Sequence, residues 1–242
     1  MPEAVHGWRK GRSPATNAFS HVGKALLIKL DLENFFPACH YSRVQQLYLD
    51  LGCSLEVALT LTRLTTADHH LPQGFLTSPV VANLLLVSMD RRLGGLVRQR
   101  GADYSRYGDD LSLSGQPSLL SAKDLATRII RESGHRVNAE KFARHGVRFS
   151  HERQEICAIT VNKKLNLRKP DYQRYQTILG NCVRNGPGCE SREGETLLHM
   201  KHRLQGYIDY VRGINRARAS QLQNGYDQIA WIVEPVLIPK SE

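Results

Sequence analysis

The stretch Arg106–Gly115 places two adjacent aspartates, Asp109 and Asp110, between two alternating runs, in the sequence RYGDDLSLSG. Alternation with period two over 102–107 and 111–114 predicts two strands. The Gly-Asp pair between them predicts a tight hairpin, because glycine tolerates positive φ and aspartate bonds its own backbone. Neighbouring carboxylates repel each other unless they face water or share a cation. The stretch is therefore either an exposed turn or part of a cation site.

The composition restricts the classes of protein that this chain can represent. It has 242 residues, 41% of them hydrophobic, enough for one large domain or two small ones. No run of about 18 apolar residues and no apolar segment near the N-terminus occurs, so the sequence predicts no membrane span and no secretory signal. Five cysteines without a Cys-x-x-Cys pair suit a reducing compartment, and we expect a cytoplasmic protein. The net charge of +10 favours a polyanionic partner.

Hydrophobic patterning predicts an α+β body followed by a helical module. The apolar run from Ala25 to Leu30 is typical of a central strand buried on both faces. A boundary near Lys163 separates the body from the helical module. The other expected elements are two helices within 41–65 divided at Gly52, one long helix over 80–98, a helix over 121–133, a strand pair around 147–149 and 156–161, and helices over 171–183, 195–211 and 217–232.

A third carboxylate, Asp31, follows the first buried strand. If that strand neighbours the hairpin in one sheet, Asp31 and Asp109 meet at its surface. Hard oxygen ligands suit Mg²⁺, and a pair of such ions can hold the attacking and leaving oxygens of a phosphoryl transfer. The alternative for Asp31 is a simple strand-end cap. A zinc site from Cys182, Cys189, His199 and His202 is disfavoured, since their spacing matches no common structural zinc site.

Three segments together resemble the palm motifs of reverse transcriptases, most of all the bacterial retron and group II intron branch. They are LIKLDLENFF, LPQGFLTSPVVANLLL and SRYGDDLSLSG, in this order. NAFSH (17–21) is similar to the Asn-Ala-x-x-His element of retron enzymes, and GHRVNAEK and ICAITVNKK resemble the two later palm motifs. The resemblance extends from about Gly7 to Trp231.

The resemblance implies a right-hand polymerase fold with a palm that contains an antiparallel sheet and the YGDD hairpin. Residues 1–24 would form partial fingers, 25–163 the palm with interleaved fingers helices at about 40–70, and 164–242 a helical thumb. The implied activity is that of an RNA-directed DNA polymerase, retron-like, with a role in defence against phage. Its partners would be an RNA template, a DNA or RNA primer, dNTPs and a structured noncoding RNA. Its cofactor would be two Mg²⁺ ions, with Mn²⁺ as a substitute.

Site residues follow from the resemblance position by position. Phe36 would be the steric gate that excludes a 2′-OH, with core packing as the alternative. For Arg12 and Lys141 the alternative is a solvent-exposed basic side chain with no role in nucleotide binding. The expected catalytic residues are Asp31, Asp109, Asp110 and Lys141; the metal ligands Asp31, Leu32, Asp109 and Asp110; the nucleotide contacts Arg12, Phe36, Gln73 and Lys141; and the primer or template contacts Asn17, His21, Gly74, Tyr107, Arg203 and Arg212.

The chain departs from the family pattern in three places. Ile156-Cys157-Ala158 stands where the family has Val-Thr-Gly, which puts recognition of a retron RNA in doubt, and Gly108 replaces the usual alanine. The family also has a fingers segment ahead of the point where this sequence begins. We therefore expect an exposed apolar face on the strand over 25–30, covered by a second protein chain or by self-association, with a coding frame that begins further upstream as the alternative. The rival functions are a catalytically silent nucleic-acid-binding subunit and a nucleotide cyclase built on the same hairpin.

Overall fold

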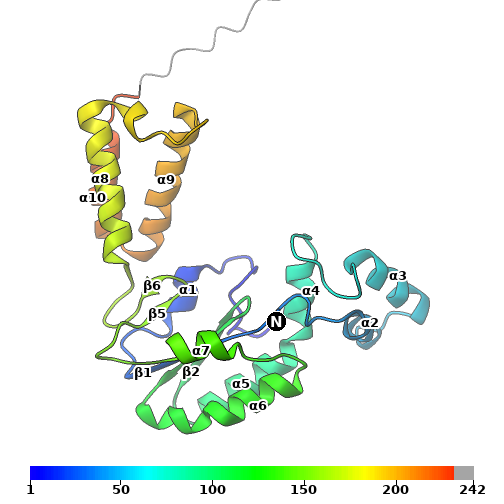
Figure 1. The fold of residues 1–242 in the computed structure, drawn as a ribbon. Coiled ribbons are helices and arrows are strands. Elements are labelled where there is room, and N and C mark those ends of the chain that lie inside the picture. The colour runs from blue at the N-terminus through cyan, green and yellow to red at the C-terminus, as the bar shows by residue number, and fades with distance from the viewer. Residues whose placement is uncertain (232–242) are drawn as a thin grey trace, which may run out of the picture. The chain divides into compact units, whose positions relative to one another are not determined.

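The computed structural model describes residues 1–231 of the chain. These residues divide into two compact units, Met1–Lys164 and a second that begins at Leu165 (Figure 1). The first unit contains a four-stranded sheet with helices around it, and the second consists mainly of helices. Each unit is described by itself below.

The sheet of the first unit has the strand order β2-β3-β1-β4, and every neighbouring pair is antiparallel. Its strands are β1 (Leu26–Asp31), β2 (Asp103–Tyr107), β3 (Asp110–Gly115) and β4 (Val147–Phe149). The apolar run that predicted a central strand is confirmed, because β1 lies between β3 and β4. The expected hairpin is also present, as β2 and β3 pair from Asp103↔Ser114 to Tyr107↔Asp110.

The pairing register gives the sheet one apolar face and one polar face. In antiparallel strands, residues directly opposite each other share a face. Leu30 lies opposite Leu111 and Ile28 opposite Leu113, whereas Lys29 lies opposite Ser112 and Asp31 opposite Asp110. The Leu-Ser-Leu-Ser alternation of β3 therefore sends its leucines into the core and its serines and Asp110 to the other face.

Helices cover the apolar face and extend the first unit to one side. Leu30, Leu111, Met89, Leu93 and Ile130 belong to one buried core, which joins the sheet to helices α5 and α6 (Figure 1). The elements are α1 (Pro14–Phe19), α2 (Tyr41–Asp50), α3 (Leu55–Thr65), α4 (Ser78–Leu85), α5 (Val87–Arg98), the 3₁₀ turn η1 (Pro117–Ala122), α6 (Lys123–Glu132) and α7 (Ala139–His145).

The single long helix expected over 80–98 is wrong, because the chain forms α4 and α5 with a break at Leu86. α4 buries Val81, Ala82 and Asn83, and α5 buries Met89, Asp90 and Leu93. Apolar residues on more than one face give no periodicity signal for such a break. Asn83 on α4 and Asp90 on α5 both bind the buried guanidinium of Arg106.

The strand pair expected between 147–149 and 156–161 is also wrong. β4 pairs with β1, in the register Leu26↔Phe149 to Ile28↔Val147. Residues 155–160 form a separate small hairpin of β5 (Glu155–Ile156) and β6 (Ile159–Thr160). Its two turn residues, Cys157 and Ala158, have φ of 49° and 62°, which is an unusual conformation for residues with a side chain.

The second unit begins with the short segment β7 (Asn166–Leu167) and continues with α8 (Lys169–Asn185), the 3₁₀ turn η2 (Pro187–Glu190), α9 (Leu197–Ile214) and α10 (Arg216–Asp227). The three helices expected here are present. The third ends at Asp227, and the expected end at Ile232 lies outside the described residues. Leu179, Leu204, Ile208 and Leu222 are buried in this unit.

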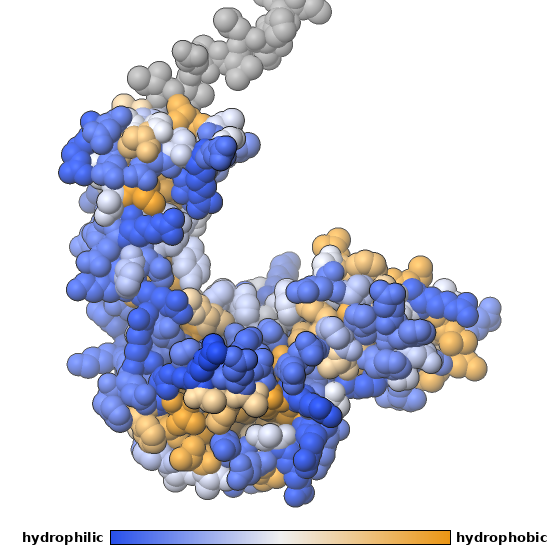
Figure 2. Space-filling view, in the orientation of Figure 1, coloured by the Kyte–Doolittle hydropathy of each residue, from blue (hydrophilic) through white to orange (hydrophobic). Residues whose placement is uncertain are grey.

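The expectation of an exposed apolar face on β1 is wrong. Leu26, Leu27, Ile28 and Leu30 are all buried, and Leu26, Ile28 and Leu30 belong to the core that also contains residues of α5 and α6. Many exposed apolar side chains of the first unit lie around α2, α3 and the start of α4, one of the regions where Figure 2 shows orange surface. They include Leu51, Leu55, Val57, Leu64, Phe75, Leu76 and Val80.

Within residues 1–231, no helix is both long enough and apolar enough to cross a membrane.

Candidate active site

The YGDD hairpin closes through a two-residue turn, Gly108-Asp109, between the paired residues Tyr107 and Asp110. Gly108 has φ of +66°, in the left-handed region that glycine enters without steric cost. The turn is fixed to β1 because the backbone N–H of Leu32 donates to the carbonyl of Asp109 over 3.0 Å. Sequence and register thus bring Asp31, Asp109 and Asp110 to one end of the sheet.

The three carboxylates stand in an environment that disfavours uncompensated negative charge. Asp31 and Asp110 are paired across β1 and β3 and lie on the same face, where like charges repel. Burial raises the pKa of Asp109, and the Asp31 carboxylate raises it further. Burial also raises the pKa of Asp110, with Asp109 and Asp31 adding to the effect against the opposing charge of Lys29. A cation at this position would relieve both effects.

Lys141 supplies one such positive charge. Its Nζ donates to Asp31 Oδ2 at 2.8 Å, and this bond raises the pKa of Lys141 above its ordinary value. The lysine lies on α7, whose N-cap Asn138 accepts from the backbone N–H of Lys141 over 3.0 Å. Because 61% of the Lys141 side chain is exposed, its ammonium can leave Asp31 without disturbing the core.

The donor set suits a hard divalent cation in its chemistry. Asp31, Asp109 and Asp110 offer carboxylate oxygens, and Leu32, whose side chain is buried, has only its backbone carbonyl to offer. Mg²⁺ is usually held by one or two carboxylates together with water and substrate phosphates. Over residues 1–231, no three His, Cys, Asp or Glu side chains meet in an arrangement that could hold a metal alone. The donors therefore fit an ion whose coordination substrate would complete.

A pocket of about 550 Å³ opens beside these residues. Its wall combines charged groups of the sheet end with the aromatic rings of Trp8, Phe35 and Phe36. Phe36 is half-buried and packs edge-on against Phe35, with ring centroids 5.0 Å apart, so it belongs both to the core and to the pocket. Six of the residues predicted from the sequence line this one pocket: Asp31, Leu32, Phe36, Gln73, Asp109 and Lys141.

Other predicted nucleotide and primer residues do not line this pocket. Arg12 lies in the loop before α1, and Gly74 is exposed with φ of +97° beside Gln73. Tyr107 is half-buried on the polar face next to Asp110, and burial raises the pKa of its hydroxyl, with Cys157 adding to the effect.

The prediction that Asn17 and His21 contact nucleic acid is not supported by their positions. Both side chains are buried. His21 is bound on both sides, by Ser114 Oγ at Nδ1 and by Ser105 Oγ at Nε2, each at 2.7 Å. Asn17 Nδ2 donates to Cys157 Sγ at 3.5 Å. The Asn-Ala-x-x-His element therefore joins α1 to the sheet and to the β5–β6 hairpin.

Arg203, another predicted primer or template contact, is paired within its own unit. Its Nε and Nη2 donate to the two carboxylate oxygens of Glu195 at 2.7 and 2.9 Å, and only 19% of the side chain is exposed. This pairing lowers the pKa of Glu195 to about 2 and neutralises the arginine. Arg212 is exposed on α9, where it contacts Asp209 and donates to Gln223 Oε1.

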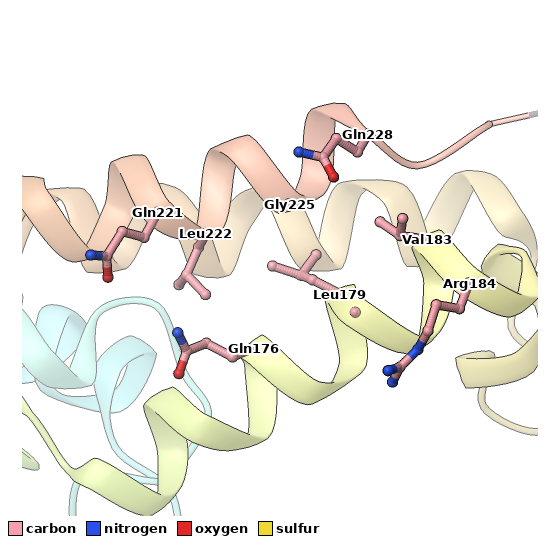
Figure 3. A pocket seen from close by; sticks show the side chains of 9 residues that line it. Gln176, Leu179, Val183, Arg184, Gln221, Leu222, Gly225 and Gln228 are labelled. Carbon is pink, nitrogen blue, oxygen red and sulfur yellow. The ribbon is translucent and has the colours of Figure 1, made fainter.

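A hollow of about 360 Å³ lies between α8 and α10 of the second unit. Figure 3 shows Leu179 and Leu222 between the two helices, with Gln176 and Gln221 toward one end and Arg184 toward the other. The helices approach closely at Gly225, where a Cβ atom would come within 3.6 Å of Leu179 Cβ.

The sequence reasoning missed the buried group that holds the hairpin turn. Arg106 is fully buried, and its Nε and Nη2 donate to the two carboxylate oxygens of Asp90, each at 2.8 Å. Its Nη1 donates to Asn83 Oδ1 and to the Gly108 carbonyl, both at 2.9 Å. The register that puts Ser105 on the polar face puts Arg106 on the helix-covered face. Strand alternation was the available signal, since it places a charged residue in the core.

Comparisons with known proteins agree with this geometry. No protein-family model matches the chain. The retron Mx65 reverse transcriptase of Myxococcus xanthus is 35% identical over 241 residues, covering 91% of this chain and 53% of the relative. The retron Ec86 enzyme of Escherichia coli is 31% identical, covering 70% of this chain and 53% of the relative. The retron Se72 enzyme of Salmonella heidelberg is 34% identical, covering 99% and 64%. The chain thus spans about half the length of the first two relatives.

Solved structures give the same answer for the fold. A foamy viral protease-reverse transcriptase in complex with an RNA/DNA hybrid aligns with a TM-score of 0.51 at 17% identity, over 91% of this chain and 26% of that one. Apo telomerase from Candida tropicalis aligns with a TM-score of 0.51 at 12% identity, over 85% and 43%. At such identities the likeness shows the fold alone. The chain is similar in sequence to bacterial retron reverse transcriptases and has the right-hand polymerase fold.

Proposed function

We propose that this chain carries the catalytic palm of an RNA-directed DNA polymerase, in the first unit, and a thumb, in the second. The observation that supports this most strongly is the pocket of about 550 Å³ on which Asp31, Asp109, Lys141, Phe36 and Gln73 converge. These residues come from segments up to 110 positions apart in the chain, as the Lys141–Asp31 bond illustrates. The substrates would be dNTPs and a primer end paired to an RNA template.

Each residue has a role that its position supports. Asp31 and Asp109, with Asp110 beside them, would hold divalent cations, which supply charge stabilisation for an in-line phosphoryl transfer. Lys141 holds a proton on Nζ near the site and would donate it to the pyrophosphate that leaves. The Phe36 ring would lie under the sugar of the incoming nucleotide, and the Gln73 amide would contact that nucleotide. Tyr107, on the same face as Asp110, would pack beside the primer end.

The first test is single-turnover extension of a primer on an RNA template with dNTPs and Mg²⁺, at enzyme concentrations above that of the substrate. Asp109→Asn should lower extension by at least about a thousandfold, because it removes one negative charge from the cation site while preserving the side-chain shape. The matched control is Asp124→Asn, the same chemical change on the exposed surface of α6, which should extend primers like the parent.

Three outcomes would contradict the proposal. Extension by Asp109→Asn at more than a few per cent of the parent rate would mean that Asp109 is not a required metal ligand. A parent chain that binds primer–template but adds no nucleotide would favour the catalytically silent subunit. Turnover of ATP or GTP without template would instead indicate a cyclase.

A further inference from the structure

The segment Ala4–Trp8 runs along the outer edge of the sheet and reaches the catalytic turn. Val5 forms a parallel bridge with Arg106, with His6 N–H donating to the Arg106 carbonyl and Arg106 N–H donating to the Ala4 carbonyl, both over 2.8 Å. β2 is the edge strand of the sheet, so this segment pairs with an edge that would otherwise stay open. The side chain of Asn83 fixes the segment again, donating to the Gly7 carbonyl over 3.0 Å.

Gly7 and Trp8 pack directly on the Tyr107-Gly108 turn. A Cβ atom at Gly7 would lie 2.4 Å from the backbone nitrogen of Gly108, so only glycine fits there. A Cβ atom at Gly108 would lie 2.9 Å from Cη2 of the Trp8 indole. The two backbones and the indole are therefore in van der Waals contact. This contact adds to the positive φ of Gly108 as a reason for glycine at position 108.

The Trp8 indole also forms part of the pocket. It stacks on Phe35 with ring centroids 6.2 Å apart and tilts against Phe36 at 5.7 Å. Its backbone has φ of +53°, a conformation that is unfavourable for a bulky residue and that often marks a functional position. Trp8 lines the pocket together with Asp31, Phe36, Gln73 and Lys141, and 47% of its surface is exposed. A tryptophan used only for packing would be buried further.

We propose that Trp8 is a specificity-determining residue for the incoming nucleotide. This inference rests on the function proposed above: the indole packs against the Phe36 ring and extends the apolar wall that the sugar and base of a dNTP would meet. The Trp8–Gly108 contact couples the position of this wall to the turn that carries Asp109. A substrate wall and a catalytic carboxylate are thereby held in one rigid arrangement.

The packing part of this proposal is tested without any activity measurement. Gly108→Ala should lower the Tm of the full chain by about 4–8 °C, through backbone strain at positive φ and through the clash with the indole. In a Trp8→Leu background, Gly108→Ala should lower the Tm by about half as much, because the clash with the indole is gone and only the backbone strain remains. Gly101→Ala is the matched control: Gly101 has φ of +62° and no atom within 4 Å of a Cβ. Its effect should be equal in both backgrounds.

The nucleotide part is tested by fluorescence and kinetics. Because the chain has two tryptophans, Trp231→Phe leaves Trp8 as the single tryptophan. Titration of this variant with dATP and Mg²⁺ should quench Trp8 emission, and inorganic triphosphate with Mg²⁺ should leave it nearly unchanged. Trp8→Leu should raise KM for dNTPs about tenfold with a smaller change in kcat, and should weaken discrimination against rNTPs. Trp8→Phe should keep KM and the discrimination against rNTPs close to those of the parent, since it keeps an aromatic ring against Phe36.

The outcomes separate this inference from the proposed function. Primer extension by the parent, with KM and dNTP/rNTP selection unchanged in Trp8→Leu, would overturn the role of Trp8 and leave the polymerase intact. An equal Tm loss for Gly108→Ala in both backgrounds would overturn the coupling. If the parent extends no primer, the polymerase proposal fails, and the dATP titration still decides whether Trp8 faces a nucleotide.

Discussion

Among single residues, Phe36 has a position from which a small change should alter chemistry more than stability. Its ring is half-buried, rests on Phe35 and Trp8, and faces the pocket that contains Asp31 and Asp109. A side chain that excludes a 2′-OH acts by steric clash, so removing it admits a substrate and breaks no bond. The sequence offered gate and core as alternatives for Phe36, and the geometry is compatible with both at once.

Phe36→Val should therefore increase the relative use of rNTPs by at least about tenfold. The measurement is the ratio of kcat/KM for a dNTP and the matching rNTP in primer extension. Phe149→Val on β4 is the control, since it makes the same change at a half-buried position away from the pocket. An unchanged ratio in an active Phe36→Val enzyme would mean that Phe36 has only a packing role.

For the elements, the link between α1 and the β2–β3 hairpin depends on one neutral histidine. His21, just after α1, bridges Ser105 on β2 and Ser114 on β3, and burial lowers its pKa to about 4. His135, also buried, has its pKa lowered to about 4 by burial and by Arg43. The folded state therefore resists protonation at both positions, whereas the unfolded chain takes up protons near pH 6.5.

This linkage fixes the sign of the pH dependence. The stabilisation is complete above the unfolded pKa of 6.5 and is lost as the pH falls from 6.5 toward the folded value of about 4. Through the titration of His21 alone, acidification from pH 7 to pH 4.5 should lower the free energy of unfolding by about 2–3 kcal/mol. Urea unfolding at the two pH values measures this. His21→Gln should show a smaller loss on acidification, and His199→Gln, exposed on α9, should match the parent.

Sequence patterns within one segment predicted those elements whose hydrophobic pattern, continuous or periodic, fits one type of secondary structure. The apolar run of β1, the alternation of β2 and β3, and the division at Gly52 between α2 and α3 were all readable, and they placed Asp31 beside the hairpin. The break at Leu86 and the pairing of β4 with β1 depend on contacts between distant segments. Composition could not reveal them, because tertiary packing decides where such boundaries fall.

The site shows the same limit. Its aspartates, Phe36, Gln73 and Lys141 were found through motifs, whereas Trp8 and Arg106 were missed. Both act through partners far along the chain: Trp8 through Gly108, and Arg106 through Asp90 and Asn83. His21 and Asn17 were assigned to the nucleic acid, yet their polar groups are used inside the first unit. Sequence alone does not show whether a conspicuous polar residue points outward or inward.

For the whole molecule, the excess of positive charge predicts how binding to primer–template should respond to salt. The chain carries 33 Lys and Arg against 23 Asp and Glu. A protein that neutralises several phosphates releases counterions, so the logarithm of the binding constant should fall linearly with the logarithm of the salt concentration. If six or more phosphates are contacted, the binding constant should fall by about a thousandfold or more between 50 and 200 mM salt. Filter binding or anisotropy across this range gives the slope.

Individual arginines of the second unit should contribute unequally to that slope. Arg184 is exposed beside the hollow between α8 and α10, so Arg184→Gln should reduce the slope by about one. Arg203 is already neutralised by its two bonds to Glu195, so Arg203→Gln should leave the slope unchanged while lowering stability. A flat salt dependence in the parent would argue against a basic binding surface. A larger effect from Arg203 than from Arg184 would mean that nucleic acid displaces Glu195 from its guanidinium.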